Sequence, residues 1–215
     1  LQLIAGISGF WIQDQPAVQT GAKKDGFFYE GKPVSPGFRQ IKEPAYSYCA
    51  MLTLGDGATV YGDCVTVVDI GYAGRTLPLR HEDMPRVEQL LKSHLEGKSF
   101  DSFKSAAQAL EAIPLPKDIS LPIVYGISQA CLAAAAHVKG VTMAEVVKAE
   151  FATPGWDGLP GFAAACGGEW YGNVDKAIAR RCAMFPHCAI QRQEEIDRLP
   201  EYVTWMLSRI AKYGG

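Results

Sequence analysis

The sequence predicts an α+β fold, and three changes of pattern along its 215 residues predict it. Residues 1–80 are rich in β-forming residues, and residues 82–151 carry apolar side chains at helical spacing. From about residue 158, short apolar runs alternate with helical patterns. A meander of about three strands followed by helices is an α+β arrangement. The strand–helix–strand–helix order of the last part is typical of the units that build a parallel sheet.

The β-rich part begins with the apolar strand candidate LQLIAGISGFWI, and FFYEGKPV has turn residues at its centre. The runs YSYCAMLTL and ATVYGDCVTVV flank Gly55-Asp56-Gly57. Two β-rich runs joined by a short glycine turn predict a hairpin. The segments DQPAVQTGAKKDG and SPGFRQIKEPA lie before this hairpin and are expected to be loops.

Residues 68–81 lead out of the hairpin and leave two interpretations open. A surface connection is the usual structure of a polar, glycine-containing segment. A mobile flap is the functional alternative, because Gly71 and Gly74 permit hinge-like backbone freedom. The two glycines do not form a phosphate-binding fingerprint, since the spacing and the lysine of such loops are missing.

Two one-sided apolar stripes predict amphipathic helices in the middle of the chain. Their members are Met84, Val87, Leu90, Leu91 and Leu95, then Phe103, Ala106, Ala107 and Leu110. Gly97 is expected to end the first of these helices. Further along, Thr142 and Glu145 form a capping-box pattern for a helix from Met143 to about Phe151.

The segment LPIVYGISQACLAAAAHVK predicts the central helix of this part. Ser120 can cap its start, Pro122 suits its first turn, and Gly140 can end it in a left-handed conformation. The helix has little polar surface, so we expect it to be buried on most sides.

The last part of the chain predicts two short strands, each followed by a helix. LPGFAAAC is the first strand candidate, and Asn173 is expected to cap the helix that follows. FPHCAIQ is the second, and a helix from Glu201 to about Lys212 ends the chain. The expected apolar face of this helix consists of Val203, Met206, Leu207 and Ile210. Two strands do not complete a barrel.

Composition is ordinary for a soluble globular protein, with 48% hydrophobic and 20% charged residues. A net charge of −2 gives no electrostatic footprint for nucleic acid or an anionic membrane. No uninterrupted apolar run approaches the ~20 residues of a membrane-spanning helix, and no signal peptide pattern is present. Six cysteines without a C-x-x-C pair favour free thiols in the cytoplasm over disulfides or zinc. Because Leu1 replaces an initiator methionine, we expect a processed or truncated N-terminus.

Many segments together resemble the front half of the methylaspartate ammonia-lyase family, within the enolase superfamily. The matching segments are SGFWIQDQ, DGFFYEGKPVSPGF, LTLGDGATVYGDC, the loop ending in AGR, YGISQACLAAAA, VTMAEVVKAEF, YGNVDK, FPHCAI and EYVTWMLSRI. The resemblance implies an α+β capping domain, an antiparallel meander followed by helices, at residues 1–155. It also implies that residues 156–215 form the first two βα units of an enolase-type (β/α) barrel.

The resemblance implies a carbon–nitrogen lyase that eliminates ammonia from 3-methylaspartate to give mesaconate. In the family, a barrel lysine removes a proton α to a carboxylate, and carboxylates on later barrel strands hold a Mg²⁺ that stabilises the enolate. By the family pattern, that lysine and those metal ligands would lie beyond Gly215, so this chain is expected to supply no metal ligand. A homodimer is the usual assembly in the family.

His187 is the candidate catalytic residue. The family's catalytic histidine lies on the second barrel strand in a P-H-A-L-I context, which His187 matches in P-H-C-A-I. Imidazole titrates near neutral pH, and the C-terminal end of a barrel strand points toward the active site. A strand-end histidine satisfied by the backbone is the structural alternative. His81, His94 and His137 match nothing functional and are expected to be surface or helix residues.

Two positions depart from the family pattern. The first barrel strand of the family carries a substrate-binding glutamine in F-A-Q-S-G, where this chain has FAAAC and therefore Ala164 or Ala165. After G-D-C the family carries another glutamine, and here Val68 stands in that place. Each hydrogen bond lost from a buried site typically costs ~1–3 kcal/mol. We therefore expect the substrate to be 3-methylaspartate or a related amino acid.

The candidate substrate-binding residues are assigned by position only. They are Ala165, Cys166, Val68 and Arg75, with Asp69 and Glu169 as nearby polar groups that could reshape recognition. Each of the charged residues has the alternative of being a solvated loop residue.

Three interpretations of function follow. The chain is part of an ammonia-lyase-like enzyme whose remaining barrel is a second chain or a missing C-terminal half. Alternatively, it is a separately encoded subunit that supplies the cap and His187 to a partner carrying the metal site. The third is a degenerate, non-catalytic binding or structural module. The lost glutamines favour the third, whereas His187, G-D-C and A-G-R favour the first two. We expect an enzyme component in a homo- or hetero-oligomer that binds no nucleic acid and no membrane.

Overall fold

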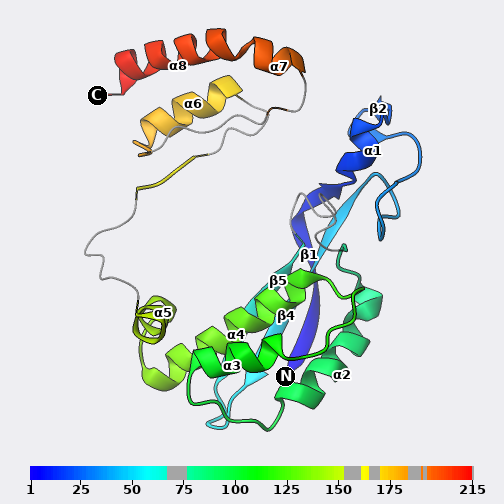
Figure 1. Cartoon of the computed structure of the whole chain (residues 1–215), viewed down its shortest axis with the longest axis vertical. Coiled ribbons are helices and arrows are strands. Elements are labelled where there is room, and N and C mark those ends of the chain that lie inside the picture. The colour runs from blue at the N-terminus through cyan, green and yellow to red at the C-terminus, as the bar shows by residue number, and fades with distance from the viewer. Residues whose placement is uncertain (67–76, 153–160, 165–169, 184–189, 191–192, 215) are drawn as a thin grey trace. The chain divides into compact units, whose positions relative to one another are not determined.

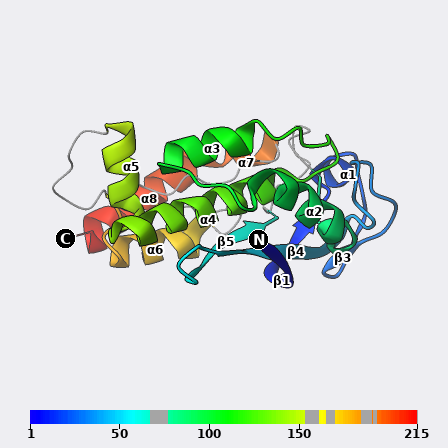
Figure 2. The ribbon, with the colours of Figure 1, turned by 90° about the horizontal axis from the view of Figure 1, so that it is seen from below.

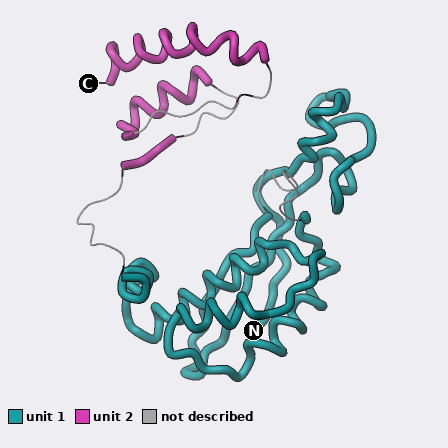
Figure 3. Tube along the Cα trace, in the orientation of Figure 1, with its two compact units in different colours: residues 1–154 teal, residues 155–215 magenta. Residues whose placement is uncertain are grey.

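The chain folds into two compact units, Leu1–Pro154 and Gly155–Gly215, in a computed structural model (Figure 3). The structure describes residues 1–66, 77–152, 161–164, 170–183, 190 and 193–214. Each unit has its own cluster of buried apolar side chains, so each has the core that a separate domain requires.

Unit 1 contains a three-stranded antiparallel sheet with the strand order β1-β4-β5. The strands are β1 (Gln2–Gln13), β4 (Lys42–Thr53) and β5 (Thr59–Val65), and the register of β1 shifts between Ile7 and Trp11. The predicted hairpin around Gly57 is present, because β4 and β5 pair from Thr53↔Thr59 to Ser47↔Val65. Gly57 has a φ of 86°, which glycine adopts without strain.

The two segments expected to be loops contain regular structure. A short helix, α1 (Gln15–Gln19), and two short paired strands, β2 (Lys24–Asp25) and β3 (Phe28–Tyr29), lie within or beside the first. Strand β4 already begins at Lys42, inside the second. The loop prediction was therefore wrong from Lys42 onward. Here β4 is the central strand, and Pro44 pairs with Trp11 immediately beyond the register shift of β1.

After α1, the helices of unit 1 are the 3₁₀ helix η2 (His81–Asp83), α2 (Met84–Leu95), α3 (Phe103–Glu111), α4 (Leu121–Lys139) and α5 (Met143–Phe151). Helices α2, α3 and α4 lie on one face of the sheet (Figures 1 and 2). The predicted capping box of Thr142 and Glu145 is present at the start of α5. Gly97 and Gly140 follow α2 and α4 with φ values of 72° and 63°, as expected for helix-ending glycines.

Helix α4 packs directly on β5 through two glycines. A Cβ atom at Gly62 would lie 1.9 Å from the carbonyl oxygen of Gly126, and one at Gly126 would lie 2.3 Å from Sγ of Cys64. Helix and strand therefore approach backbone to backbone, at a separation that no side chain larger than hydrogen permits. The predicted role of α4 as the central helix of the layer agrees with this contact.

The expectation that α4 is buried on most sides is wrong. Only 39% of its most apolar 18-residue window is buried, and Tyr125 is 64% exposed. The sheet covers one side of the helix and α3 and α5 reach only parts of it, so the rest of its apolar surface remains open. Among the described residues, α4 is long and apolar enough to cross a membrane by length and composition alone, whereas the sequence had suggested no such segment. Ser120 stands at the N-cap position, but its side chain does not cap the first turn.

Strand β1 is an outer strand of the sheet, and side chains from η2 and α2 bind its backbone. The amide of Leu3 donates to Oε2 of Glu88 at 2.7 Å. His81 Nε2 lies 2.9 Å from the carbonyl oxygen of Gly6. The Leu3 amide and the neighbouring Lys92 ammonium hold the pKa of the Glu88 carboxyl below its usual range.

Unit 2 contains α6 (Trp170–Ala179), α7 (Gln193–Asp197) and α8 (Leu199–Tyr213). The end of α8 agrees with the predicted final helix, and Met206 and Ile210 of its predicted apolar face are packed. The predicted cap of α6 and the other two residues of that face differ from the structure. Asn173 does not cap α6, because the helix is already formed at Trp170. Val203 and Leu207 are 42% and 57% exposed. The packed side chains of α8 are Leu199, Tyr202, Trp205, Met206 and Ile210, which form one cluster with Trp170, Tyr171, Val174 and Ile178.

The first predicted strand of unit 2 is described only at residues 161–164. The amide of Ala183 donates to the carbonyl oxygen of Phe162 at 2.8 Å, and Phe162 is 69% exposed. Of the second predicted strand, FPHCAIQ, only Ile190 lies within the described residues.

Candidate functional site

Nearly all of the predicted site residues lie outside the described residues. His187, Ala165, Cys166, Val68 and Arg75 belong to this group, as do Asp69 and Glu169. Ala164 is described and is partly exposed at the end of residues 161–164. The structure therefore does not test these assignments.

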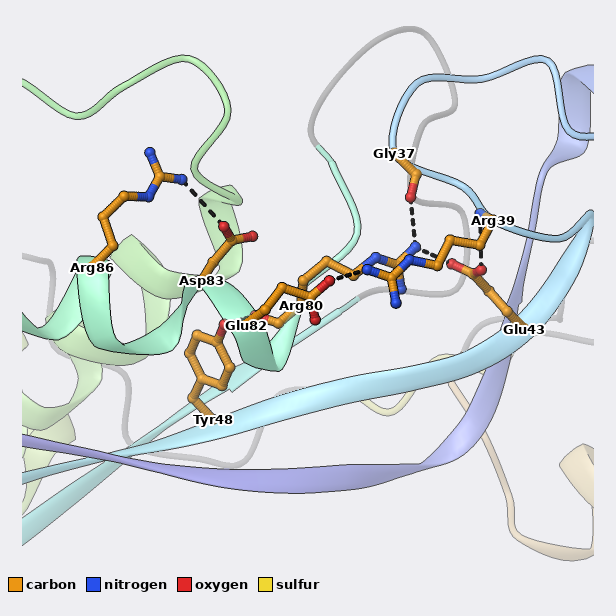
Figure 4. Close-up of polar contacts among 8 residues, drawn as sticks. All are labelled: Gly37, Arg39, Glu43, Tyr48, Arg80, Glu82, Asp83 and Arg86. Atoms are coloured by element: carbon orange, nitrogen blue, oxygen red, sulfur yellow. Dashed lines mark hydrogen bonds and ion pairs between the residues drawn. The ribbon is translucent and has the colours of Figure 1, made fainter.

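Two buried charges of unit 1, Glu43 and Arg80, form an ion pair (Figure 4). Their side chains are only 5% and 10% exposed. Nη2 of Arg80 binds Oε1 of Glu43 and donates to the carbonyl oxygen of Gly37 at 2.5 Å. The other carboxylate oxygen of Glu43 accepts the amides of Arg39 and Gln40 at 3.1 and 3.3 Å. The pair thus joins residues 37–43 to the segment before α2.

The backbone around Arg80 is held at three further points. The amide of Leu79 donates to Oγ1 of the fully buried Thr66 at 3.3 Å. The hydroxyl of Tyr48 donates to the carbonyl oxygen of Arg80. Gly37, with a φ of 82°, lies so close to the following segment that a Cβ there would be 2.9 Å from Cδ of Pro78. Burial raises the pKa of the Tyr48 phenol, so this hydroxyl remains a proton donor at neutral pH.

Neighbouring residues on the surface form exposed ion pairs. Arg39 binds Glu82, and Arg86 contacts Asp118 at 2.9 Å and Asp83 at 3.4 Å. The hydrogen bond from Arg86 lowers the pKa of the Asp118 carboxyl. Exposed pairs of this kind contribute about 0–1 kcal/mol each. Removing one partner of a buried pair typically costs about 3–5 kcal/mol, so the buried pair dominates the local energetics.

Both carboxylate oxygens of Glu43 accept hydrogen bonds within unit 1. Within the part of the chain that the structure describes, no three histidine, cysteine, aspartate or glutamate side chains come together as metal ligands.

Four cysteines lie within the described residues. Cys49, Cys64, Cys131 and Cys182 are free thiols, as predicted. Burial raises the pKa of Cys64 to about 12 and that of Cys131 to about 11, so both stay protonated and unreactive at neutral pH.

As expected, the three described histidines belong to helices. His81 contacts the β1 backbone, and Nδ1 of His94 lies 2.9 Å from the carbonyl oxygen of Leu90. His137 forms an exposed pair with Asp56 at 2.8 Å.

A cavity of about 710 Å³ in unit 1 lies between the hairpin tip, residues 95–102 and α4. Its lining is mixed, with apolar side chains such as Leu54 and Phe100 beside charged ones. Lys139, one of the charged lining residues, is paired with Glu150 at 2.5 Å.

Asp14 is a second buried carboxylate of unit 1. It accepts the amides of Val34 and Ser35 at 2.6 and 2.9 Å and the Ser35 hydroxyl at 2.5 Å. Burial opposes ionisation of Asp14, but the hydrogen bonds from Ser35 and Val34 outweigh it and lower the pKa of this carboxyl below its ordinary value of 3.8.

Because the folded-state pKa of Asp14 is lowered, its contribution to stability is complete above the ordinary pKa. It is lost as the pH falls through the lowered value. Replacing Asp14 by asparagine is expected to lower the free energy of unfolding by about 2 kcal/mol at neutral pH. It should also flatten the loss of stability in acid. Urea unfolding of wild type and variant over a pH series measures both effects, and equal acid slopes would contradict this assignment.

Sequence analysis missed Glu43, Arg80 and Asp14 as buried charges. The available signal was local: Arg80 follows the apolar run Leu77-Pro78-Leu79, and Glu43 lies in an alternating strand pattern. A charge inside an apolar run predicts burial only when its partner is known, and these partners are 37 residues apart.

Comparison with known proteins defines the family. The family model described as Methylaspartate ammonia-lyase N-terminus matches residues 1–152, and the one described as Methylaspartate ammonia-lyase C-terminus matches residues 157–215. The chain belongs to the methylaspartate ammonia-lyase family. The two matches divide the chain where the two compact units meet, between residues 152 and 157.

Known members of the methylaspartate ammonia-lyase family match nearly the whole chain. Methylaspartate ammonia-lyase from Clostridium tetanomorphum is 37% identical over 96% of this chain and 52% of its own length. The magnesium complex of β-methylaspartase from that organism has a TM-score of 0.86 at 34% identity, covering 98% of this chain and 52% of that one. The enzyme from Citrobacter amalonaticus, containing (2S,3S)-3-methylaspartic acid, has a TM-score of 0.90 at 32% identity, covering 98% and 53%.

This chain thus spans about half the length of the relatives that it matches. The predicted family and the predicted mixed α+β fold class are both confirmed.

Proposed function

We propose that this chain is a component of a methylaspartate ammonia-lyase-like enzyme, a cytoplasmic enzyme of amino-acid metabolism. The complete enzyme eliminates ammonia from 3-methylaspartate or a related amino acid. Unit 1 acts as the enolase-superfamily capping domain, and unit 2 provides the first two βα units of the barrel. A partner chain or a C-terminal half supplies the rest, in a homo- or hetero-oligomer such as a dimer.

The observation that carries the proposal is that two family models together match nearly the whole chain and divide it where the compact units divide. The N-terminal family model ends at residue 152 and the C-terminal one begins at residue 157, and the boundary between the two compact units lies between these positions. In unit 2, Phe162 belongs to the described part of the first predicted strand, and its side chain is largely exposed. A barrel strand is normally covered on both faces, so an exposed phenylalanine there supports the need for further barrel elements.

The proposed site consists of the residues that match the family pattern. His187 exchanges a proton or donates a hydrogen bond beside the reacting carbon, which suits a group that titrates near neutral pH. Ala165 and Cys166 on the first barrel strand, with Val68 and Arg75 after the hairpin, contact the substrate. The guanidinium of Arg75 suits a substrate carboxylate, whereas Val68 and Ala165 offer only apolar contact.

The metal of this enzyme would be held elsewhere. The magnesium complex of a relative makes Mg²⁺ the expected ion. The described residues do not fit it, because no three candidate ligands lie together among them. We therefore assign the Mg²⁺ ligands and the lysine base to the remaining half of the barrel. This chain contributes the cap, His187 and the substrate contacts.

A non-catalytic role is the second candidate, and one observation favours it. Both positions where the family pattern has a substrate-binding glutamine carry alanine or valine here. A chain that lost two substrate contacts could retain only a binding or structural role. The two candidates differ in whether the assembled protein releases ammonia.

The test is ammonia release by the assembled protein. Native mass spectrometry first identifies the complex that contains this 23.3 kDa chain. We expect a partner of roughly barrel size or a longer parent polypeptide. With Mg²⁺ present, the purified complex is expected to release ammonia from 3-methylaspartate or from an aspartate with another 3-substituent.

The matched control is this chain alone, which is expected to release none. A complex that carries the missing half but acts on no 3-substituted aspartate would establish the non-catalytic role. If this chain never associates with a partner that carries the rest of the barrel, the proposal that it is a component of an enzyme is refuted.

A further inference from the structure

The cavity of about 710 Å³ in unit 1 is lined entirely by residues that the structure describes. Its most deeply buried lining residues are Ala106 of α3 and Cys131 of α4, which are 5% and 9% exposed. Most of the other lining residues belong to the hairpin tip at residues 52–55, to residues 95–102 between α2 and α3, and to the second half of α4. The cavity is therefore a product of the tertiary fold and not of a single loop.

This cavity has the size of a ligand pocket. Sites for small molecules typically have volumes of about 300–1,000 Å³, whereas one water molecule occupies about 30 Å³ of the liquid. The lining side chains of α4 include the short ones of Cys131, Ala134 and Ala135, and Leu52 and Leu54 of the hairpin tip leave space between them and the helix. Atoms that border such a space lack packing partners on one side, so a ligand of complementary shape gains dispersion contacts there.

Apolar side chains line the cavity from its interior to the surface. Leu54 and Leu95 are partly buried in this lining, whereas Phe100 and Val138 are 37% and 77% exposed. Transfer of apolar surface out of water is favourable. A molecule with an apolar body would remove these surfaces from water, so the lining favours such a body over a polar one.

The charged side chains of the lining balance one another. Glu96 and Asp101 are acidic, and Lys98 and Lys139 are basic. Lys139 is bound by Glu150 at 2.5 Å, and that carboxylate also accepts two amides at the start of α3 at 3.1 and 2.7 Å. The lining side chains thus carry no net charge that would attract an anion or a cation, and a charge buried without a partner is costly. An uncharged ligand fits this lining best.

We propose that this cavity is a binding site for an uncharged amphiphile, a molecule with an apolar body and a hydroxyl or similar uncharged polar end. The body contacts the leucines and alanines of the lining, and the polar end exchanges hydrogen bonds with the hydroxyls of Thr53 and Ser99. The inference goes beyond the proposed function. Its ligand differs in class from 3-methylaspartate, whose carboxylates and ammonium group are charged.

The test is a titration of the full chain with 1-octanol, followed by NMR of methyl-labelled alanine and leucine. The methyl signals of Leu54, Ala134 and Ala135 are expected to shift and to saturate together. Ala45 is fully buried in another cluster of unit 1, so its signal should stay in place. The dissociation constant of 1-octanol is expected to be at least about 10-fold lower than those of octanoate and octylamine, whose ends are charged.

Three variants locate the site. Ala135→Trp places a large side chain in the cavity and should weaken octanol binding at least about 10-fold. The matched control is Ala144→Trp, because Ala144 is an exposed alanine of α5 outside the lining. Val138→Lys adds a cation at a largely exposed position of the lining, so it should keep the fold and strengthen octanoate binding about threefold. Val138→Lys therefore decides the test even if Ala135→Trp does not fold.

Each outcome supports or overturns the site. Saturable shifts at the cavity methyl groups, lost in Ala135→Trp and kept in Ala144→Trp, establish it. Absent shifts, or unchanged octanoate binding in Val138→Lys, overturn it, and equal affinity for octanoate or octylamine overturns the uncharged class of ligand. Binding that disappears when the chain assembles with the rest of the barrel would show that a protein surface covers the cavity, which also overturns the ligand site. Failure of the complex to release ammonia concerns the proposed function alone.

Discussion

Replacing Gly126 by alanine is expected to lower the free energy of unfolding of unit 1 by at least about 2 kcal/mol. A methyl group there would lie 2.3 Å from Sγ of Cys64 and 2.7 Å from its amide nitrogen. The helix preference for alanine over glycine favours the variant by about 1 kcal/mol. Overpacking of a close contact costs about 3 kcal/mol when, as here, backbone atoms cannot rotate away. The cost of overpacking therefore exceeds the gain in helix preference, and the variant is destabilised.

Thermal unfolding measures this effect, with an expected decrease of about 4–8 °C in Tm for a chain of this size. Gly62→Ala enters the same contact from the strand, 1.9 Å from the Gly126 carbonyl oxygen, and should be at least as damaging. The matched control is Gly9→Ala on β1, because a Cβ there would meet no atom within 4 Å. Equal stability of the Gly126 and Gly9 variants would show that α4 can move away from β5.

Replacing His187 by alanine is expected to lower kcat of the assembled lyase by about 10²–10⁴-fold, the usual contribution of a general acid or base. The expectation rests on the P-H-C-A-I match and on the titration of imidazole near neutral pH. His187→Gln should be nearly as inactive, since an amide can donate a hydrogen bond but cannot exchange a proton at neutral pH. Steady-state rates of ammonia release with Mg²⁺ measure both losses.

The control for His187 is His137→Ala. His137 pairs with Asp56 on an exposed surface of unit 1, and an exposed pair contributes about 0–1 kcal/mol. Its loss should leave kcat and KM within about twofold of the wild type. If the His187 variant keeps normal kcat, the histidine is a strand-end residue satisfied by the backbone, and the family resemblance does not extend to its role.

The sequence was a good guide wherever one local rule determined the structure. Gly97 and Gly140 end helices because each adopts a left-handed conformation, and Thr142 with Glu145 caps α5 through contacts within one turn. Structures of this kind depend only on residues that are close together in the sequence. The hairpin around Gly57 belongs to the same group.

The sequence failed where the outcome depends on a distant partner. In α8, apolar residues are so dense that two helical faces are possible, and the aromatic partners Trp170 and Tyr171 select the face with Tyr202 and Trp205 over Val203. The pairing of Glu43 with Arg80 likewise depends on how β4 lies against the segment before α2. The candidate site came from family resemblance alone, because no local pattern in the sequence marks its residues.

The side chains on the outer edge of β1 have a consequence for association. An uncovered edge strand offers its amides and carbonyls as a template on which another chain can add a strand. In β1, the Glu88 carboxylate accepts the amide of Leu3, so this amide is unavailable to an incoming backbone. Addition of another strand is therefore disfavoured where β1 begins. A neighbouring molecule that packs there would do so through side-chain surfaces, whose specificity residue substitutions can tune.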